Sequence, residues 1–125
     1  MAQWNLWAGW IGILMGMASG AALGLFFHDE GWLGGYGAWP RRMLRLGHVS
    51  FFGIAFLNLS FAGTLYVTHA EASQPLASRL LIAAAVLMPA TCALAAWRRP
   101  LRHLFPVPAL SLLAAAGFTL GGLLK

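Results

Sequence analysis

A chain of 125 residues is long enough for one domain. Charged residues make up 9% of it and hydrophobic residues 60%, whereas a soluble domain carries about a quarter charged residues and has too little interior to hide so much apolar surface. The composition therefore excludes a soluble fold and indicates that lipid is the solvent. The net charge of +5 does not indicate nucleic-acid binding, because the basic residues stand between apolar runs, where they act as topology signals.

The apolar runs predict the fold class. Crossing the hydrocarbon core takes about 20 residues of helix, because each residue advances about 1.5 Å and the core is about 30 Å thick. Lipid offers no water to unpaired backbone groups, so helices are the expected spanning structure. We predict an all-α integral membrane protein in which residues 1–125 form one transmembrane domain, an antiparallel bundle of four helices. The predicted spans are 5–27, 43–68, 80–97 and 107–124.

The first predicted span carries a small residue at every fourth position, starting at Ala8, and the last span carries a shorter pair. A spacing of four keeps these residues on one helix face, where the missing side chains let another helix approach closely. We expect both faces to pack against helices, and each face is a candidate partner for the other. The glycines of the two rows are Gly12, Gly16, Gly20 and Gly24 in the first span and Gly117 and Gly121 in the last.

Two of the three connections between the predicted spans hold most of the arginines. The positive-inside rule places both connections on the cytoplasmic side, and both chain termini are then expected on the other side, which carries only Arg79 and Lys125. We also expect the two clusters to contact anionic lipid headgroups or to dock a partner protein. The clustered residues are Arg41, Arg42 and Arg45 in the first connection and Arg98, Arg99 and Arg102 in the third.

The second predicted span is the most polar of the four and places Asn58 near mid-membrane. Polar residues inside a span are costly, so they usually face a helix, a water-filled cavity or a ligand. We favour an interhelical hydrogen bond for Asn58, since such bonds are common in membrane proteins. The alternative is a hydrogen bond to the carbonyl group of a bound quinone or pigment.

Histidines are the candidate haem ligands of this chain. His28, His48 and His103 are all expected at the cytoplasmic side, whereas His69 lies at the opposite side. Axial histidines must face each other across the macrocycle from different elements, so His48 with either His28 or His103 is the candidate pair for haem b. The interpretation we favour is that these histidines lie at the interface or form ordinary hydrogen bonds.

No acidic residue stands inside a predicted span, which argues against an ion pump working alone. The sequence also lacks the phosphate-binding, zinc-binding and activated-nucleophile motifs, so we do not expect an enzyme. We predict a small accessory or scaffold subunit of a larger respiratory or photosynthetic complex, in contact with lipids and other subunits, in a bacterial inner membrane or an equivalent energy-transducing membrane. One alternative is an electron-transfer subunit that binds haem b or a quinone through His48. A second is a small oligomeric transporter or channel.

Overall fold

The computed structural model describes residues 1–69 and 74–124, so Lys125, which the orientation argument uses, lies outside the described residues. All regular secondary structure in these ranges is helical. The predicted all-α class is therefore confirmed for the described part of the chain. The elements are α1 (Ala2–Gly24), the short 3-10 helix η1 (Trp32–Gly34), α2 (Trp39–Val67), α3 (Pro75–Trp97), the 3-10 helix η2 (Arg99–Leu104) and α4 (Pro106–Leu123).

Four helical segments are long and apolar enough to cross a membrane. They contain 23, 29, 23 and 25 residues, the last counted from Arg99 through η2 and α4. At about 1.5 Å per residue, even the shorter ones span about 34 Å, slightly more than the hydrocarbon core. The lengths and compositions are those of a multi-pass membrane protein.

The starts of α2 and α3 differ most from the predicted ones, and proline is the reason in both. We expected spans to start at residues 43 and 80, but α2 starts at Trp39 and α3 at Pro75. Pro40 and Pro75 occupy the first turns of these helices, where a missing backbone N–H costs nothing and the fixed φ angle already fits the helix. Each proline therefore opens a helix that extends beyond the apolar run used to predict it.

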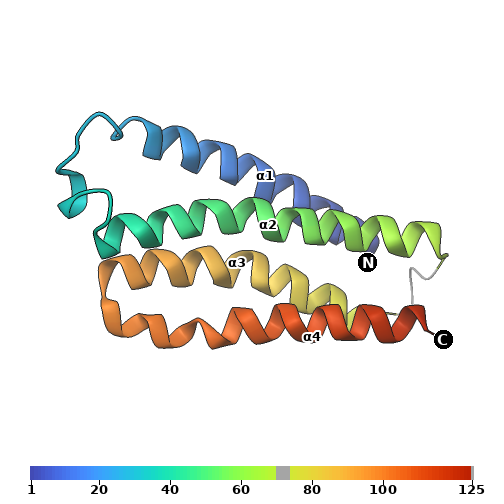
Figure 1. Ribbon diagram of the computed structural model, residues 1–125. Helices are drawn as coiled ribbons and strands as arrows, with labels where there is room; N and C mark the ends of the chain where they lie inside the picture. The colour runs from blue at the N-terminus through green and yellow to red at the C-terminus, as the bar shows by residue number, and fades with distance from the viewer. Residues whose placement is uncertain (70–73, 125) are drawn as a thin grey trace.

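The helices pack mainly in chain order: α1 lies along α2, α2 along α3, and α3 along α4. The chain reverses direction at each connection, so both termini lie at the same end of the molecule (Figure 1). Contacts between α1 and α3 are much sparser than those of either helix with α2. Figure 1 shows α1 diverging from α3 toward the end of the molecule that holds the connection between α1 and α2.

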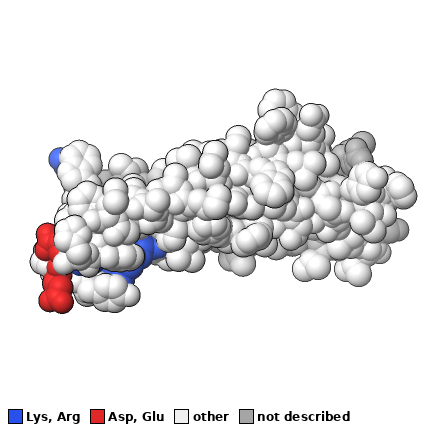
Figure 2. All heavy atoms as spheres, turned by 90° about the horizontal axis from the view of Figure 1, so that it is seen from above, with Lys and Arg blue, Asp and Glu red and all other residues white. Residues whose placement is uncertain are grey.

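The main buried apolar cluster joins α2, α3 and α4 near the end where the chain termini lie. It contains Phe61, Leu65, Ala77, Leu81 and Ala115. Elsewhere the helices expose large apolar side chains to the surroundings. In the view of Figure 2 the blue and red side chains all gather at one end, and the other described residues on that face are uncharged. We call this the arginine end. An apolar surface of this extent suits lipid and would aggregate in water.

The glycine row of α1 forms the contact between α1 and α2. A Cβ atom added at Gly12 would lie 2.9 Å from the Ala55 Cβ, and one added at Gly16 would lie 2.7 Å from the Phe52 ring. Gly20 meets His48 in the same way, while Gly24 has nothing within 4 Å.

These contacts correct one expectation. We considered that the glycine faces of the first and last spans pack against each other, but Gly12, Gly16 and Gly20 of α1 contact α2 instead. A Cβ atom at Gly117 or Gly121 would meet no atom of the described chain within 4 Å. The expected mating of the two faces is therefore wrong, because α2 is the nearest neighbour of α1 and takes its small-residue face.

Candidate functional site

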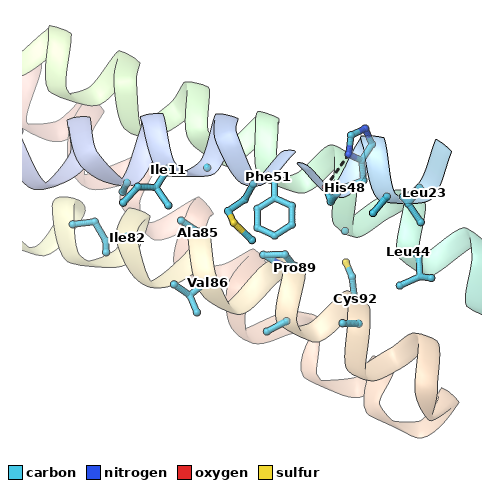
Figure 3. Close-up of a pocket in the computed structure, with 18 of the residues that line it drawn as sticks. Ile11, Leu23, Leu44, His48, Phe51, Ile82, Ala85, Val86, Pro89 and Cys92 are labelled. Carbon is cyan, nitrogen blue, oxygen red and sulfur yellow. Dashed lines mark hydrogen bonds between the residues drawn. The ribbon is translucent and has the colours of Figure 1, made fainter. Parts of the chain in front are cut away.

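A groove of about 1190 Å³ runs between α1 and α3, and α2 forms its floor. Its lining contains no Asp, Glu, Lys or Arg side chain and consists mostly of aliphatic and aromatic residues. Figure 3 shows the lining side chains of the three helices around this space. The lining residues are Trp4, Trp7, Ala8, Ile11, Gly12, Met15, Ser19, Ala22, Leu23, Phe26, Trp32, Leu44, Gly47, His48, Phe51, Ile82, Ala85, Val86, Pro89, Ala90, Cys92, and Ala93.

The groove has the length of a membrane span. Its lining on α1 extends from Trp4 to Leu23, which is about 28 Å along an ideal helix and close to the thickness of the hydrocarbon core. The groove exists because α1 and α3 are held together at one end only. Near the chain termini Asn5 of α1 bonds Ser78 of α3, whereas toward the arginine end α1 follows α2 and leaves α3.

A buried polar cluster ties three helices together at that closed end. The Asn5 amide donates to Asn58 Oδ1 over 2.8 Å, and the Ser78 hydroxyl donates to Asn5 Oδ1. The Asn58 amide donates to the carbonyl oxygens of Ile54, at 3.0 Å, and Leu81, at 3.3 Å. Asn5 and Asn58 are both fully buried. Hydrogen bonds between helices are a main source of specificity in apolar surroundings, so this cluster fixes the register of α1, α2 and α3.

The interhelical hydrogen bond that we favoured for Asn58 is thus confirmed. Its carbonyl and both amide hydrogens have partners within the protein, and Asn58 is not part of the groove lining. No local pattern indicated that Asn58 pairs with Asn5 or Ser78, which are 53 and 20 residues away in the chain. Asn5 lies at the very start of the first predicted span, and Ser78 lies before the predicted start of the third.

His48 lies on the floor of the groove and makes its polar contact with α1. Its Nδ1 is 3.1 Å from the Ser19 Oγ, which is also 3.0 Å from the carbonyl oxygen of Gly16. That carbonyl can only accept, so the hydroxyl proton is assigned to this bond and Nδ1–H of His48 donates to Ser19. Figure 3 shows the Phe51 ring pointing into the groove and the His48 ring turned toward α1. The His48–Ser19 pair therefore helps to attach α1 to α2.

The other candidate haem ligands lie elsewhere. His28, in the connection after α1, and His103, in η2, are both exposed and do not line the groove. His48 is consequently the one histidine of the groove lining. Within residues 1–69 and 74–124, no group of three or more His, Cys, Asp or Glu side chains is arranged to hold a metal ion.

Arg41 differs from the other arginines because it is buried, with 3% of its surface exposed. Its guanidinium group donates to the carbonyl oxygens of Asp29 and Glu30 over 3.3 and 3.5 Å. It also lies within 6 Å of three aromatic ring centroids, a cation–π arrangement. This burial corrects the expectation that Arg41 docks lipid or a partner: it holds the connection between α1 and α2 in place. The three rings belong to Phe27, Trp32 and Tyr36.

The Trp32 ring forms part of the groove wall at the arginine end. It stacks on Phe26 with a centroid distance of 4.7 Å and an angle of 8° between the rings, and both residues line the groove. Because Arg41 lies over the same Trp32 ring, the buried guanidinium positions this wall. Nothing in the local sequence indicated that Trp32 stacks on Phe26 and contacts Arg41.

Three further arginines lie over aromatic rings at the arginine end. Arg45 lies 3.7 Å from the Tyr36 centroid, Arg98 lies 4.8 Å from that of Trp97, and Arg99 lies 5.9 Å from that of Trp39. The Trp39 indole donates to the Ala95 carbonyl over 2.7 Å, which joins the start of α2 to the end of α3. Arg42 and Arg102 are exposed. The guanidinium groups of Arg42 and Arg102 are therefore accessible to anions outside the protein.

Comparisons of the chain with protein-family models, with curated proteins and with solved structures find no match. The class is therefore defined by the fold: an all-helical chain with four segments able to cross a membrane and an apolar groove of membrane-spanning length.

Proposed function

We propose that the protein is a small accessory subunit of a larger membrane complex. In this proposal the four helices form an antiparallel bundle in a bacterial inner membrane or an equivalent energy-transducing membrane. The arginine end faces the cytoplasm and both termini face the other side, as the positive-inside rule requires. The complex is respiratory or photosynthetic, and this chain contributes helix packing and lipid contacts.

The observation that carries the proposal is the outer face of α4. This helix buries only Pro108 and Ala115 among its described residues. Gly117 and Gly121 lie about 160° and 120° around the helix from Ala115, at about 100° per residue, and a Cβ atom at either position would meet nothing within 4 Å. Gly12, Gly16 and Gly20 of α1 contact α2, whereas the α4 pair has no partner within the described chain.

A Gly-x-x-x-Gly pair facing away from its own protein is suited to another transmembrane helix. In lipid, apolar side chains gain little from meeting each other, so association depends on close backbone approach and dispersion contacts. Gly117 and Gly121 permit that approach. A second copy of this chain could use the same face, and this is the arrangement that the oligomeric transporter or channel requires.

Replacing Gly117 by isoleucine tests the proposal. The branched side chain keeps the partner helix at a distance, so we expect recovery of partner subunits with the tagged chain to fall about tenfold, equivalent to ~1.4 kcal/mol. The measurement is extraction from the native membrane in mild detergent, followed by quantitative mass spectrometry. Gly63→Ile is the matched control, because Gly63 on α2 is also exposed with nothing within 4 Å.

The outcomes separate the three hypotheses. Loss of the partners in Gly117→Ile and their retention in Gly63→Ile supports the accessory-subunit proposal. Recovery of the unaltered chain without other subunits contradicts it. Recovery of the chain as a homo-oligomer also contradicts it and favours the transporter or channel. A visible absorption band or a co-purified quinone that disappears in His48→Ala favours the electron-transfer subunit instead.

A further inference from the structure

We propose that the groove between α1 and α3 binds an acyl chain of an anionic phospholipid, whose phosphate group lies at Arg98. This inference goes beyond the accessory role and rests on a different part of the molecule. The accessory role depends on the outer face of α4, whereas the lipid site uses α1, α2 and the end of α3.

The chemistry of the lining selects a hydrocarbon chain. The groove contains no charged side chain, and its His48–Ser19 pair is hydrogen-bonded internally. A polar headgroup deep in the groove would lose its hydration without adequate replacement. An acyl chain loses nothing of this kind and gains close contact with Ile82, Val86 and Phe51, which line the space.

The length of the groove suits an acyl chain. The lining extends for about 28 Å along α1, which is close to the thickness of the hydrocarbon core, so one acyl chain that enters at the interface fits within it.

Arg98 is suitably placed for the phosphate group. Ala93 lines the groove near its arginine end, and Trp97 lies one helical turn further along the same face of α3. Trp97 is 74% exposed, and the Arg98 guanidinium lies 4.8 Å from its ring centroid. Stacking orients the guanidinium and still leaves its N–H groups for the bidentate contacts that arginine makes with phosphate. On the other wall, the Phe26–Trp32 stack flanks the same end of the groove.

The net charge favours an anionic lipid over a neutral one. The chain carries +5, and the contacts of Arg41, Arg45, Arg98 and Arg99 in the described part of the chain are with aromatic rings and backbone carbonyl groups. Each basic side chain near a membrane surface attracts anionic lipid by about 1 kcal/mol. A phospholipid with its phosphate at Arg98 and one chain in the groove satisfies both the charge and the apolar surface.

The test uses two neighbouring alanines of α1. Ala22 lines the groove and Ala21 does not, and both are exposed, so tryptophan is tolerated sterically at either position. The full chain is reconstituted in vesicles of equal parts phosphatidylglycerol and phosphatidylethanolamine, extracted in mild detergent, and examined for retained lipid by native mass spectrometry. We expect Ala22→Trp to lose the retained phosphatidylglycerol and Ala21→Trp to keep it.

A second pair of variants tests the phosphate contact. Arg98→Gln is expected to lower the affinity for phosphatidylglycerol about fivefold, whereas Arg79→Gln, at an exposed arginine near the opposite end of α3, leaves the bound lipid unchanged. Equal retention of the two lipids by the unaltered chain overturns the anionic preference. Retention by Ala22→Trp equal to that of Ala21→Trp overturns the groove as the site. Both measurements use the isolated chain, so failure of the accessory role leaves them interpretable.

Discussion

Replacing Gly12 by leucine is expected to lower the free energy of unfolding by about 3 kcal/mol, at the upper end of the usual cost of overpacking a well-packed contact. A Cβ at this position would lie 2.9 Å from the Ala55 Cβ and 3.3 Å from the Phe51 carbonyl oxygen. Neither atom can rotate away, since one is attached directly to the backbone and the other belongs to it. The remaining response is a separation of α1 from α2, which weakens the whole seam.

The measurement is reversible unfolding in mixed micelles of a mild detergent and dodecyl sulfate, followed by far-ultraviolet circular dichroism. Gly24→Leu is the control, because Gly24 lies on the same helix and has nothing within 4 Å; we expect it to change stability by less than about 0.5 kcal/mol, as surface substitutions do. Equal stability of the Gly12 and Gly24 variants would mean that α1 does not pack on α2 through its glycines.

Replacing Asn58 by leucine is expected to destabilise the protein by about 2 kcal/mol. The substitution removes the acceptor of the Asn5 amide and the donor to the Leu81 carbonyl oxygen, and both groups are buried. A buried polar group left without a partner costs about 1–3 kcal/mol, while an interhelical hydrogen bond in a membrane protein contributes about 0.6 kcal/mol on average. The penalty for the stranded Asn5 therefore exceeds the loss of the bond itself.

The double variant Asn5→Leu/Asn58→Leu separates these two contributions. It leaves no stranded Asn5 amide, and the Ser78 hydroxyl can bond to a backbone carbonyl one turn back, as serine commonly does in helices. We expect its loss of stability to be smaller than the sum of the two single losses by about 1 kcal/mol, measured by the same unfolding assay. Strict additivity would show that Asn5 and Asn58 do not interact.

Several features of the fold and of the site were predictable because they depend on local sequence. Runs of about 20 apolar residues specify spanning helices, since a backbone in lipid must satisfy its own hydrogen bonds, and all four expected helices are present. The fourfold spacing of small residues on α1 likewise indicated a helix contact, and Gly12, Gly16 and Gly20 make one. The hydrogen bond expected for Asn58 followed from the cost of a polar group in a span.

The partners in these contacts were not predictable, because each joins positions that are distant in the chain. Asn5 and Ser78 are 73 residues apart and carry no local signal of their meeting. Arg41 belongs to a cluster whose pattern predicts an exposed surface, yet it is buried among aromatic rings of the preceding connection. Among Arg41, Arg42 and Arg45, only Arg41 is buried. Its burial depends on how the connection folds back over α2, which composition does not predict.

Hydropathy and residue spacing are properties of one helix in one solvent, and they establish the class of protein and the kind of contact that each helix face can make. Packing between distant segments sets the rest: α1 pairs with α2, the α4 glycines face outward, and α1 and α3 meet at one end and separate at the other. The groove follows from that last arrangement. A space between helices depends on the angle and register of their packing, and in lipid these are set by small differences among many similar apolar contacts.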